Sequence, residues 1–188
     1  MESSETDVKA EKNSNDEDKN VISSELCDEL ISFHQKHKET PVVQKTIYGY
    51  GENTNCYSLA VCDFPEYDAK IHNVMIGIVD QLRKDHEYFL FGVHDSGYEL
   101  REVYGPTMIH ADNQIDDEDF RVLSVIIALT DDYDGGIFNF PKQSYQVKLK
   151  KGEAITFPPT HFYPHEVSGP KNGKRYTICT WLLYDTHN

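Results

Sequence analysis

Apolar residues recur at helical spacing in two stretches of the first half of the chain, with polar residues between them. The first predicted helix begins at a cap formed by Ser23 or Ser24, and its apolar positions are Leu26, Leu30, Ile31 and Phe33. The second runs from about Glu66 to His86, and its apolar stripe consists of Ile71, Val74, Met75, Ile78, Val79 and Leu82. Both stripes are typical of helices that pack against a sheet, so we assign them to the core.

Two strands are predicted between these helices, near residues 43–48 and 57–61. The segment that joins them, residues 49–55, is rich in glycine and asparagine, which favour turns. Such a segment is compatible with a lid that closes over a substrate and equally with an ordinary surface hairpin.

Beyond Phe89 the pattern changes to short strands that turn residues separate. The run at residues 122–129 is almost entirely apolar, which predicts a central strand buried on both faces. The other predicted strands are residues 98–104, 137–140, 145–149, 154–157, 165–167 and 175–183. Many short strands at this spacing indicate an α+β, mainly β fold, a sandwich or barrel such as a jelly roll, with supporting N-terminal helices.

Length and composition suit one soluble domain, because the chain has 188 residues of which 38% are hydrophobic and 27% charged. Residues 1–20 contain seven acidic and three basic residues, so we predict a disordered acidic tail followed by a single domain at 21–188. The net charge of −14 argues against nucleic-acid binding, which relies on basic surface. No apolar run reaches membrane-spanning length, and the N-terminus has no secretion signal.

The cysteines point to the compartment. None of the four belongs to a C-x-x-C pair, which favours free thiols in the reducing cytoplasm. A disulfide between Cys56 and Cys62 remains the alternative for an exported protein.

The candidate chemistry lies in the second half of the chain. In a strand, His110 and Asp112 would point to the same face, so an imidazole and a carboxylate could hold one ion. His165 from a distant strand would complete two histidines and one carboxylate, a set that leaves positions on iron(II) open for oxygen chemistry. Arg175, ten residues further on, offers a planar fork for a second carboxylate.

The last predicted strand alternates in a way that buries this arginine. One face carries Arg175, Thr177, Cys179 and Trp181, and the other carries Tyr176, Ile178, Thr180 and Leu182. An arginine at the closed end of a barrel, on the same face as a tryptophan, requires a buried anion, which a carboxylate supplies.

Further motifs follow in a fixed order. They are the turn and aromatic strand at 134–140, the G-x-A-x-x-F-P run at 152–158, H-x-V at 165–167, and G-x-R at 173–175 before Trp181. Together with H-x-D at 110–112, this order resembles the prolyl 4-hydroxylase-like branch of the 2-oxoglutarate- and iron(II)-dependent dioxygenases. The resemblance covers roughly Tyr104 to Leu183, and it implies the double-stranded β-helix form of the jelly roll.

The resemblance also implies roles. His110, Asp112 and His165 would bind iron(II), and Arg175 would bind the distal carboxylate of 2-oxoglutarate, with dioxygen as the other reactant and ascorbate as a candidate reductant. His161 is the rival third ligand, but it follows Pro158-Pro159-Thr160, where the chain is expected to turn, so we favour His165.

One departure concerns a tyrosine that several relatives place on the strand before the G-G turn to bind 2-oxoglutarate. The matching residues 126–129 contain none. Tyr104 is therefore the candidate hydroxyl, with a structural core tyrosine as the alternative, and Thr177 is a second candidate.

By resemblance the substrate is a peptidyl proline in a protein or peptide, hydroxylated at carbon 4 while 2-oxoglutarate is converted to succinate and carbon dioxide. Trp181 with Tyr50 or Phe138 could form an aromatic wall for the pyrrolidine ring. The alternatives are another amino-acid side chain, a small metabolite, or a non-catalytic metal-binding jelly roll, because fold does not fix function.

Overall fold

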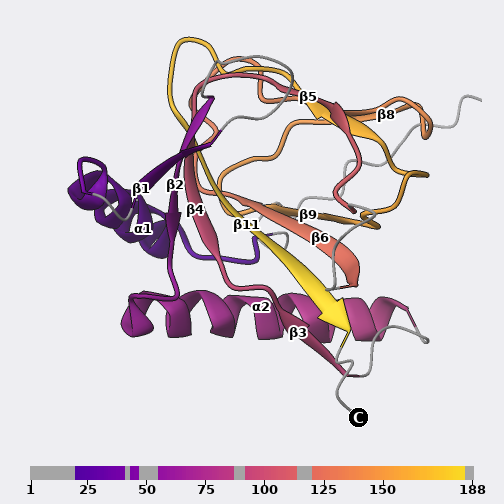
Figure 1. Ribbon diagram of the computed structural model, residues 1–188, viewed down its shortest axis with the longest axis horizontal. Coiled ribbons are helices and arrows are strands. Elements are labelled where there is room, and N and C mark those ends of the chain that lie inside the picture. The colour runs from indigo at the N-terminus through magenta and orange to yellow at the C-terminus, as the bar shows by residue number, and fades with distance from the viewer. Residues whose placement is uncertain (1–19, 41–42, 47–54, 87–91, 114–119, 185–188) are drawn as a thin grey trace, which may run out of the picture.

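The computed structural model describes residues 20–40, 43–46, 55–86, 92–113 and 120–184. Two helices, α1 (Ser24–His37) and α2 (Pro65–Asp85), precede most of the strands (Figure 1). The strands are β1 (Val43–Thr46), β2 (Cys56–Ala60), β3 (Val93–Asp95), β4 (Glu99–Val103), β5 (Thr107–His110), β6 (Arg121–Ala128), β7 (Phe138–Phe140), β8 (Tyr145–Val147), β9 (Ala154–Phe157), β10 (His165–Val167) and β11 (Arg175–Tyr184).

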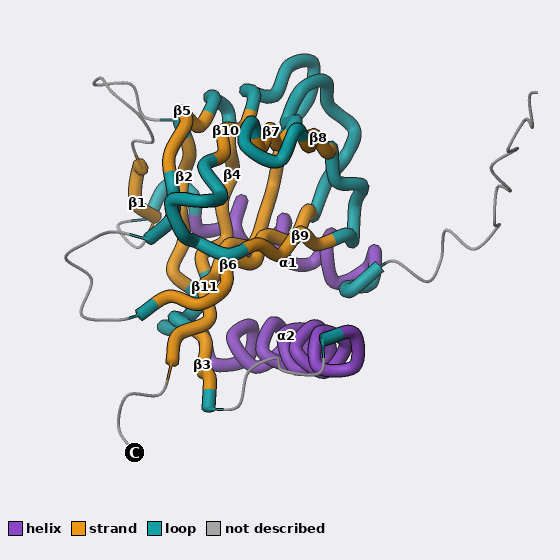
Figure 2. Tube along the Cα trace, turned by 90° about the vertical axis from the view of Figure 1, so that its right-hand side faces the viewer, coloured by secondary structure: helices purple, strands orange, loops and turns teal. Residues whose placement is uncertain are grey.

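The strands form two antiparallel sheets. The larger has the order β1-β2-β4-β11-β6-β9, with β3 also paired to β11, and the smaller has the order β5-β10-β7-β8. In both views α2 lies on the side of the larger sheet that faces away from the smaller sheet (Figures 1 and 2). This arrangement of two facing sheets with helices behind one of them confirms the predicted jelly roll.

The larger sheet divides the interior into two cores, and β11 contributes to both. On the helix side, Tyr176, Ile178 and Leu182 pack with residues of both helices. On the other side, Cys179 and Trp181 pack with residues of the smaller sheet such as Phe138. The alternation predicted for residues 175–183 is therefore confirmed, and it places the even positions in the scaffold and the odd positions between the sheets.

Local sequence accounts for the helix ends. The Ser23 hydroxyl accepts a hydrogen bond from the Leu26 backbone N–H at 3.2 Å, so Ser23 caps α1 as predicted. Pro65 occupies the first turn of α2, where its missing N–H has no intrahelical partner to lose. The predicted stripe of α2 is buried at Ile71, Met75 and Ile78.

Some predictions differ from the structure or lie outside it. Strands β3 and β5 were not among the predicted ranges. The acidic tail up to residue 19, most of the possible lid at 49–55, and Tyr50 lie outside the described residues.

The four cysteines are free, with Cys62 exposed and the other three buried. No helix among the described residues is long and apolar enough to cross a membrane.

A buried histidine in α1 links stability to pH. His34 is fully buried; its Nε2 donates to the Tyr57 carbonyl oxygen at 3.1 Å, and Nδ1 has no hydrogen-bond partner among the described residues. Burial lowers the pKa of His34, and the smaller opposing effects of the Tyr57 carbonyl and the Glu102 carboxylate do not cancel it. The folded state therefore holds this imidazole neutral.

We expect the free energy of unfolding to decrease as the pH falls below about 6.5, the ordinary pKa of the unfolded histidine. The unfolded chain takes up the proton first, so stability is lost between this pH and the lowered pKa, by at most about 1.4 kcal/mol per pH unit. Urea unfolding from about pH 8 to about pH 5 should show a smaller slope for His34→Gln than for the wild type. The exposed His161→Gln is the control, and parallel curves for His34→Gln and wild type would contradict the assignment.

Candidate metal centre and its pocket

The two histidines of the predicted triad lie opposite each other on neighbouring strands. In the antiparallel pair of β5 and β10, His110 and His165 are direct partners, and their ring centroids are 4.4 Å apart. His165 is buried against the rings of Phe157 and Phe140, whose centroids lie 4.6 and 5.5 Å away. Strand pairing therefore brings together two imidazoles that are distant in the sequence.

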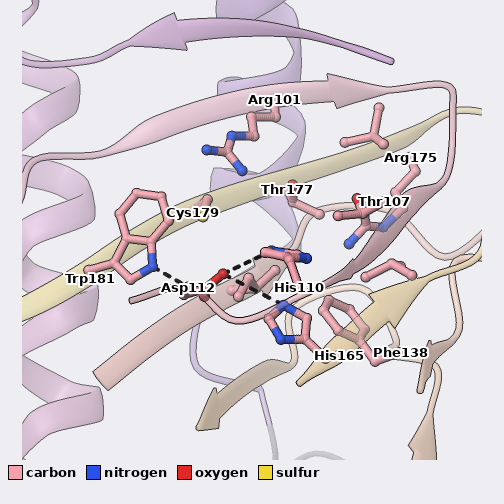
Figure 3. Close-up of a pocket in the computed structure, with 13 residues that line it drawn as sticks. Arg101, Thr107, His110, Asp112, Phe138, His165, Arg175, Thr177, Cys179 and Trp181 are labelled. Atoms are coloured by element: carbon pink, nitrogen blue, oxygen red, sulfur yellow. Dashed lines mark hydrogen bonds and ion pairs between the residues drawn. The ribbon is translucent and has the colours of Figure 1, made fainter. Parts of the chain in front are cut away.

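Asp112 lies next to the two histidines, but it is not on the strand with His110, as the sequence had suggested. Strand β5 ends at His110, and the chain then bends, as the Asn113 N–H bonds the Pro159 carbonyl oxygen at 2.8 Å. The Asp112 Oδ1 atom lies 3.0 Å from His110 Nε2 and 3.7 Å from His165 Nε2 (Figure 3). One ligand atom from each of the three residues lies within 4.8 Å of the others, so the predicted set of three converges.

The far side of each imidazole is bonded to a backbone carbonyl. His110 Nδ1 lies 2.8 Å from the Met108 oxygen, and His165 Nδ1 lies 3.4 Å from the Tyr163 oxygen. Since a carbonyl only accepts, these bonds favour the tautomer with the proton on Nδ1. The Nε2 atoms then face Asp112, where each would ligate a metal once it is deprotonated.

The second carboxylate oxygen of Asp112 is held from behind. The Ser124 hydroxyl donates to Asp112 Oδ2 at 2.5 Å, and the Trp181 indole N–H donates to the same oxygen at 3.2 Å. These two donors turn Oδ1 toward the histidines. Sequence reasoning did not single out Ser124, because one serine inside an apolar strand carries no signal of its own.

Electrostatics favours the charged carboxylate. Burial alone would raise the pKa of Asp112, but the hydrogen bond from His110, the charge of His165 and the hydrogen bond from Ser124 together lower it to about 2. For His165, burial lowers the pKa. For His110 burial also lowers the pKa, but the hydrogen bonds with Asp112 and with the Met108 carbonyl oxygen outweigh it, so the pKa is raised. Binding of a cation would therefore displace the proton that His110 shares with Asp112.

Arg175 lies in the same pocket, at the end away from Trp181 (Figure 3). It is 5% exposed, and its guanidinium carbon lies 5.4 Å from the centroid of the Phe138 ring. Burial lowers the pKa of Arg175, which the hydrogen bond and charge interaction with the Tyr133 hydroxyl partly offset. No carboxylate forms an ion pair with this guanidinium among the described residues. The site therefore suits an anionic ligand.

Of the two residues predicted to offer a hydroxyl to 2-oxoglutarate, only Thr177 lies in the pocket. Thr177 lines the pocket beside Arg175, as does Thr107 of β5, which was not predicted. Tyr104 is not among the residues that line the pocket: it comes directly after Val103, the last residue of β4, which does line it. Tyr104 is 45% exposed and its ring lies 5.4 Å from that of Tyr57. The tyrosine that reaches Arg175 is Tyr133.

His161, the rival third ligand, is exposed and lies outside the triad. It follows β9 in the turn before β10, and its carbonyl oxygen accepts a hydrogen bond from Lys142 Nζ at 3.1 Å. The turn expected from the two prolines therefore separates His161 from His165 in space.

The donor set and its pocket agree with comparisons to known proteins. Residues 101–183 match the family described as the 2OG-Fe(II) oxygenase superfamily. These residues form a 2OG-Fe(II) oxygenase domain. Two imidazoles and one carboxylate suit iron(II), and the buried arginine suits 2-oxoglutarate, so the residues present fit the iron, 2-oxoglutarate and dioxygen of this family. No curated protein sequence matches the chain as a relative.

Solved structures share the fold of the oxygenase domain and of the helices before it. A viral collagen prolyl hydroxylase from Paramecium Bursaria Chlorella virus-1, in complex with 2OG, has a TM-score of 0.63 at 18% identity and covers 88% of this chain and 92% of its own. A Trichoplax adhaerens prolyl hydroxylase, in complex with a peptide fragment of the hypoxia inducible factor oxygen degradation domain, has a TM-score of 0.63 at 17% identity, covering 88% and 81%. A Pseudomonas putida prolyl-4-hydroxylase has a TM-score of 0.60 at 18% identity, covering 88% and 89%.

The bond from Ser124 to Asp112 predicts an effect on iron affinity. Removing the hydroxyl with Ser124→Ala is expected to weaken iron(II) binding by about 10- to 100-fold, because the carboxylate loses a donor that orients it. Anaerobic iron titration of the purified protein measures this effect. Thr180→Val is the matched control: Thr180 is equally buried, but its hydroxyl bonds the Gly97 carbonyl oxygen on the other face of β11. Equal affinities for the two variants would contradict the role of Ser124.

Proposed function

We propose that the protein hydroxylates a prolyl residue in a peptide or protein and converts 2-oxoglutarate to succinate and carbon dioxide in the same reaction. The observation that carries this proposal is a complete triad and a buried arginine in one pocket of an oxygenase domain. The prolyl substrate is supported by the likeness of nearly the whole chain to prolyl hydroxylases from a virus, an animal and a bacterium.

The residues would divide the work between two ends of the pocket. His110, Asp112 and His165 would hold the iron, which when bound activates dioxygen for the oxidation of both 2-oxoglutarate and substrate. Arg175 would bind the distal carboxylate of 2-oxoglutarate through its paired donors, with Thr177 beside it. The aromatic rings packed against His165 would exclude water from that side of a bound metal. Trp181 is left as the aromatic surface at the substrate end, since Phe138 packs against Arg175.

The test is a panel of proline-containing peptides incubated with iron(II), 2-oxoglutarate and air, followed by mass spectrometry and a succinate assay. We expect one peptide to gain a single oxygen on proline, with succinate formed in equal amount. Oxygen on another side chain or on a metabolite would support those alternatives instead. Stable iron binding with no succinate from any substrate would indicate a binding module.

Two further expectations belong to this proposal. Free cysteines are compatible with a reducing compartment such as the cytoplasm. Ascorbate is proposed as a reductant that keeps the metal in its iron(II) state, so adding it should prolong turnover without changing the product.

A further inference from the structure

Tyr133, which the sequence did not single out, is bound to the buried arginine of the pocket. It is 5% exposed, and its hydroxyl is hydrogen-bonded to the Arg175 guanidinium. Arg175 lines the cavity, whereas Tyr133 does not. The hydroxyl therefore meets the guanidinium on the side that faces the protein, and the side that faces the cavity is left to a ligand.

The turn that carries Tyr133 is held beside the segment that leads into β11. Before Tyr133 in the sequence, the Thr130 hydroxyl donates to the Lys174 carbonyl oxygen at 2.8 Å. After it, Asp134 and Lys171 exchange two backbone hydrogen bonds of 2.8 Å each. These contacts on both sides of the tyrosine fix its backbone next to the strand that begins with the arginine.

The ring of Tyr133 is enclosed as well. A Cβ at Gly136 would lie 3.0 Å from the hydroxyl oxygen, so only glycine leaves room for the ring at this position. Lys148 Nζ lies 4.6 Å from the ring centroid, and it donates a hydrogen bond to the Tyr133 carbonyl oxygen. The ring therefore has little space in which to turn away from the guanidinium.

A phenol suits the task of orienting a charged ligand-binding group. An arginine side chain has many rotamers, and a contact that fixes one of them reduces the entropy lost when a ligand binds. A carboxylate in this place would neutralise the guanidinium, whereas a neutral phenol oxygen accepts one N–H bond and leaves the charge available. Burial raises the pKa of the Tyr133 hydroxyl, which keeps it neutral.

We propose that Tyr133 is a positioning residue, which orients Arg175 for the distal carboxylate of 2-oxoglutarate without touching 2-oxoglutarate itself. The inference rests on the proposed function only in taking 2-oxoglutarate as the ligand of Arg175. The affinity of the pocket for a dicarboxylate then depends on a side chain outside the cavity and on the turn that holds it.

Two keto acids separate this role from a general effect on the pocket. 2-Oxoglutarate carries the distal carboxylate, and 2-oxopentanoate has the same carbon chain with a methyl group in its place. The first would be titrated calorimetrically, without oxygen, into protein loaded with iron(II), and the second would be measured by its displacement of the first. Tyr133→Phe should weaken 2-oxoglutarate binding by about 10-fold, the lower end for a hydrogen bond to a charged group, and leave 2-oxopentanoate binding unchanged.

A double-mutant cycle tests whether Tyr133 acts through Arg175. In the Arg175→Met background, Tyr133→Phe should cause no further loss of 2-oxoglutarate affinity, because the group that the hydroxyl orients is gone. Tyr98→Phe is the matched control, since Tyr98 is 3% exposed, donates its hydroxyl to Asp95 at 2.7 Å and does not line the pocket. This control should leave both affinities unchanged.

The outcomes separate this inference from the proposed function. Wild-type affinity of Tyr133→Phe for 2-oxoglutarate, an equal loss for both keto acids, or a loss that persists beside Arg175→Met would overturn the positioning role. Equal binding of the two keto acids by the wild type would overturn the roles of Arg175 and Tyr133 together. The expected pattern of binding without any oxygen transfer to proline would refute prolyl hydroxylation but leave the role of Tyr133 standing.

Discussion

Arg175→Met should raise the KM for 2-oxoglutarate by about 100-fold or more, since breaking a buried ion pair from one side costs about 3–5 kcal/mol. Arg175 is 5% exposed and has no carboxylate ion pair among the described residues, so 2-oxoglutarate is the anion expected to compensate its charge. Arg175→Lys should fall between wild type and Arg175→Met, because it keeps the charge and loses the paired donors. Steady-state succinate formation at varied 2-oxoglutarate measures all three.

Thermal unfolding provides a second readout of the same contact. Ligand that binds only the folded state raises the melting temperature, so wild-type protein with iron(II) should be stabilised by added 2-oxoglutarate. Arg175→Met should lose most of this shift. Without 2-oxoglutarate the variant should be at least as stable as wild type, because it no longer buries a charge. An undiminished shift in Arg175→Met would show that another group binds the distal carboxylate.

His165→Ala should abolish turnover and lower the iron(II) affinity by about 100-fold or more. Losing a metal ligand should cost more than losing a supporting hydrogen bond, which costs about 10- to 100-fold. His165 is buried and its Nε2 is 3.7 Å from Asp112 Oδ1, so no exposed group can replace it. His161→Ala is the matched control, four residues away in the sequence and exposed. Anaerobic iron titration and succinate release measure both variants. Loss of iron from His161→Ala with retention by His165→Ala would refute the triad.

The sequence predicted the parts of the site that strand alternation and motif order control. Period-two alternation predicted that Arg175 and Trp181 lie on the same face of β11, and the antiparallel pairing with the neighbouring strands fixes this arrangement. The choice of His165 over His161 followed from prolines that prevent the chain from continuing straight. These features are local, so they could be read without knowledge of the tertiary structure.

Features that depend on long-range convergence were predicted less well. Asp112 reaches the triad through a bend after β5, which hydrogen bonds to distant residues stabilise, and not through strand alternation. Tyr104 has the right residue type, but it lies just beyond the end of β4 and its side chain is 45% exposed outside the pocket. Tyr133 comes from a polar turn and reaches Arg175 because Gly136 leaves room for its ring: a Cβ at this position would lie 2.5 Å from the Tyr133 Cε2 atom. Such packing has no signature in a single strand or turn.

The ten residues of β11 separate what the molecule does from how it stays folded. Even-numbered residues such as Ile178 pack in the core between the larger sheet and the helices, whereas odd-numbered residues such as Cys179 and Trp181 line the pocket. Selection for a new substrate can therefore change the pocket-facing residues of β11 and leave the residues on its other face unchanged. That separation makes the strand a natural site of divergence among enzymes that share this architecture.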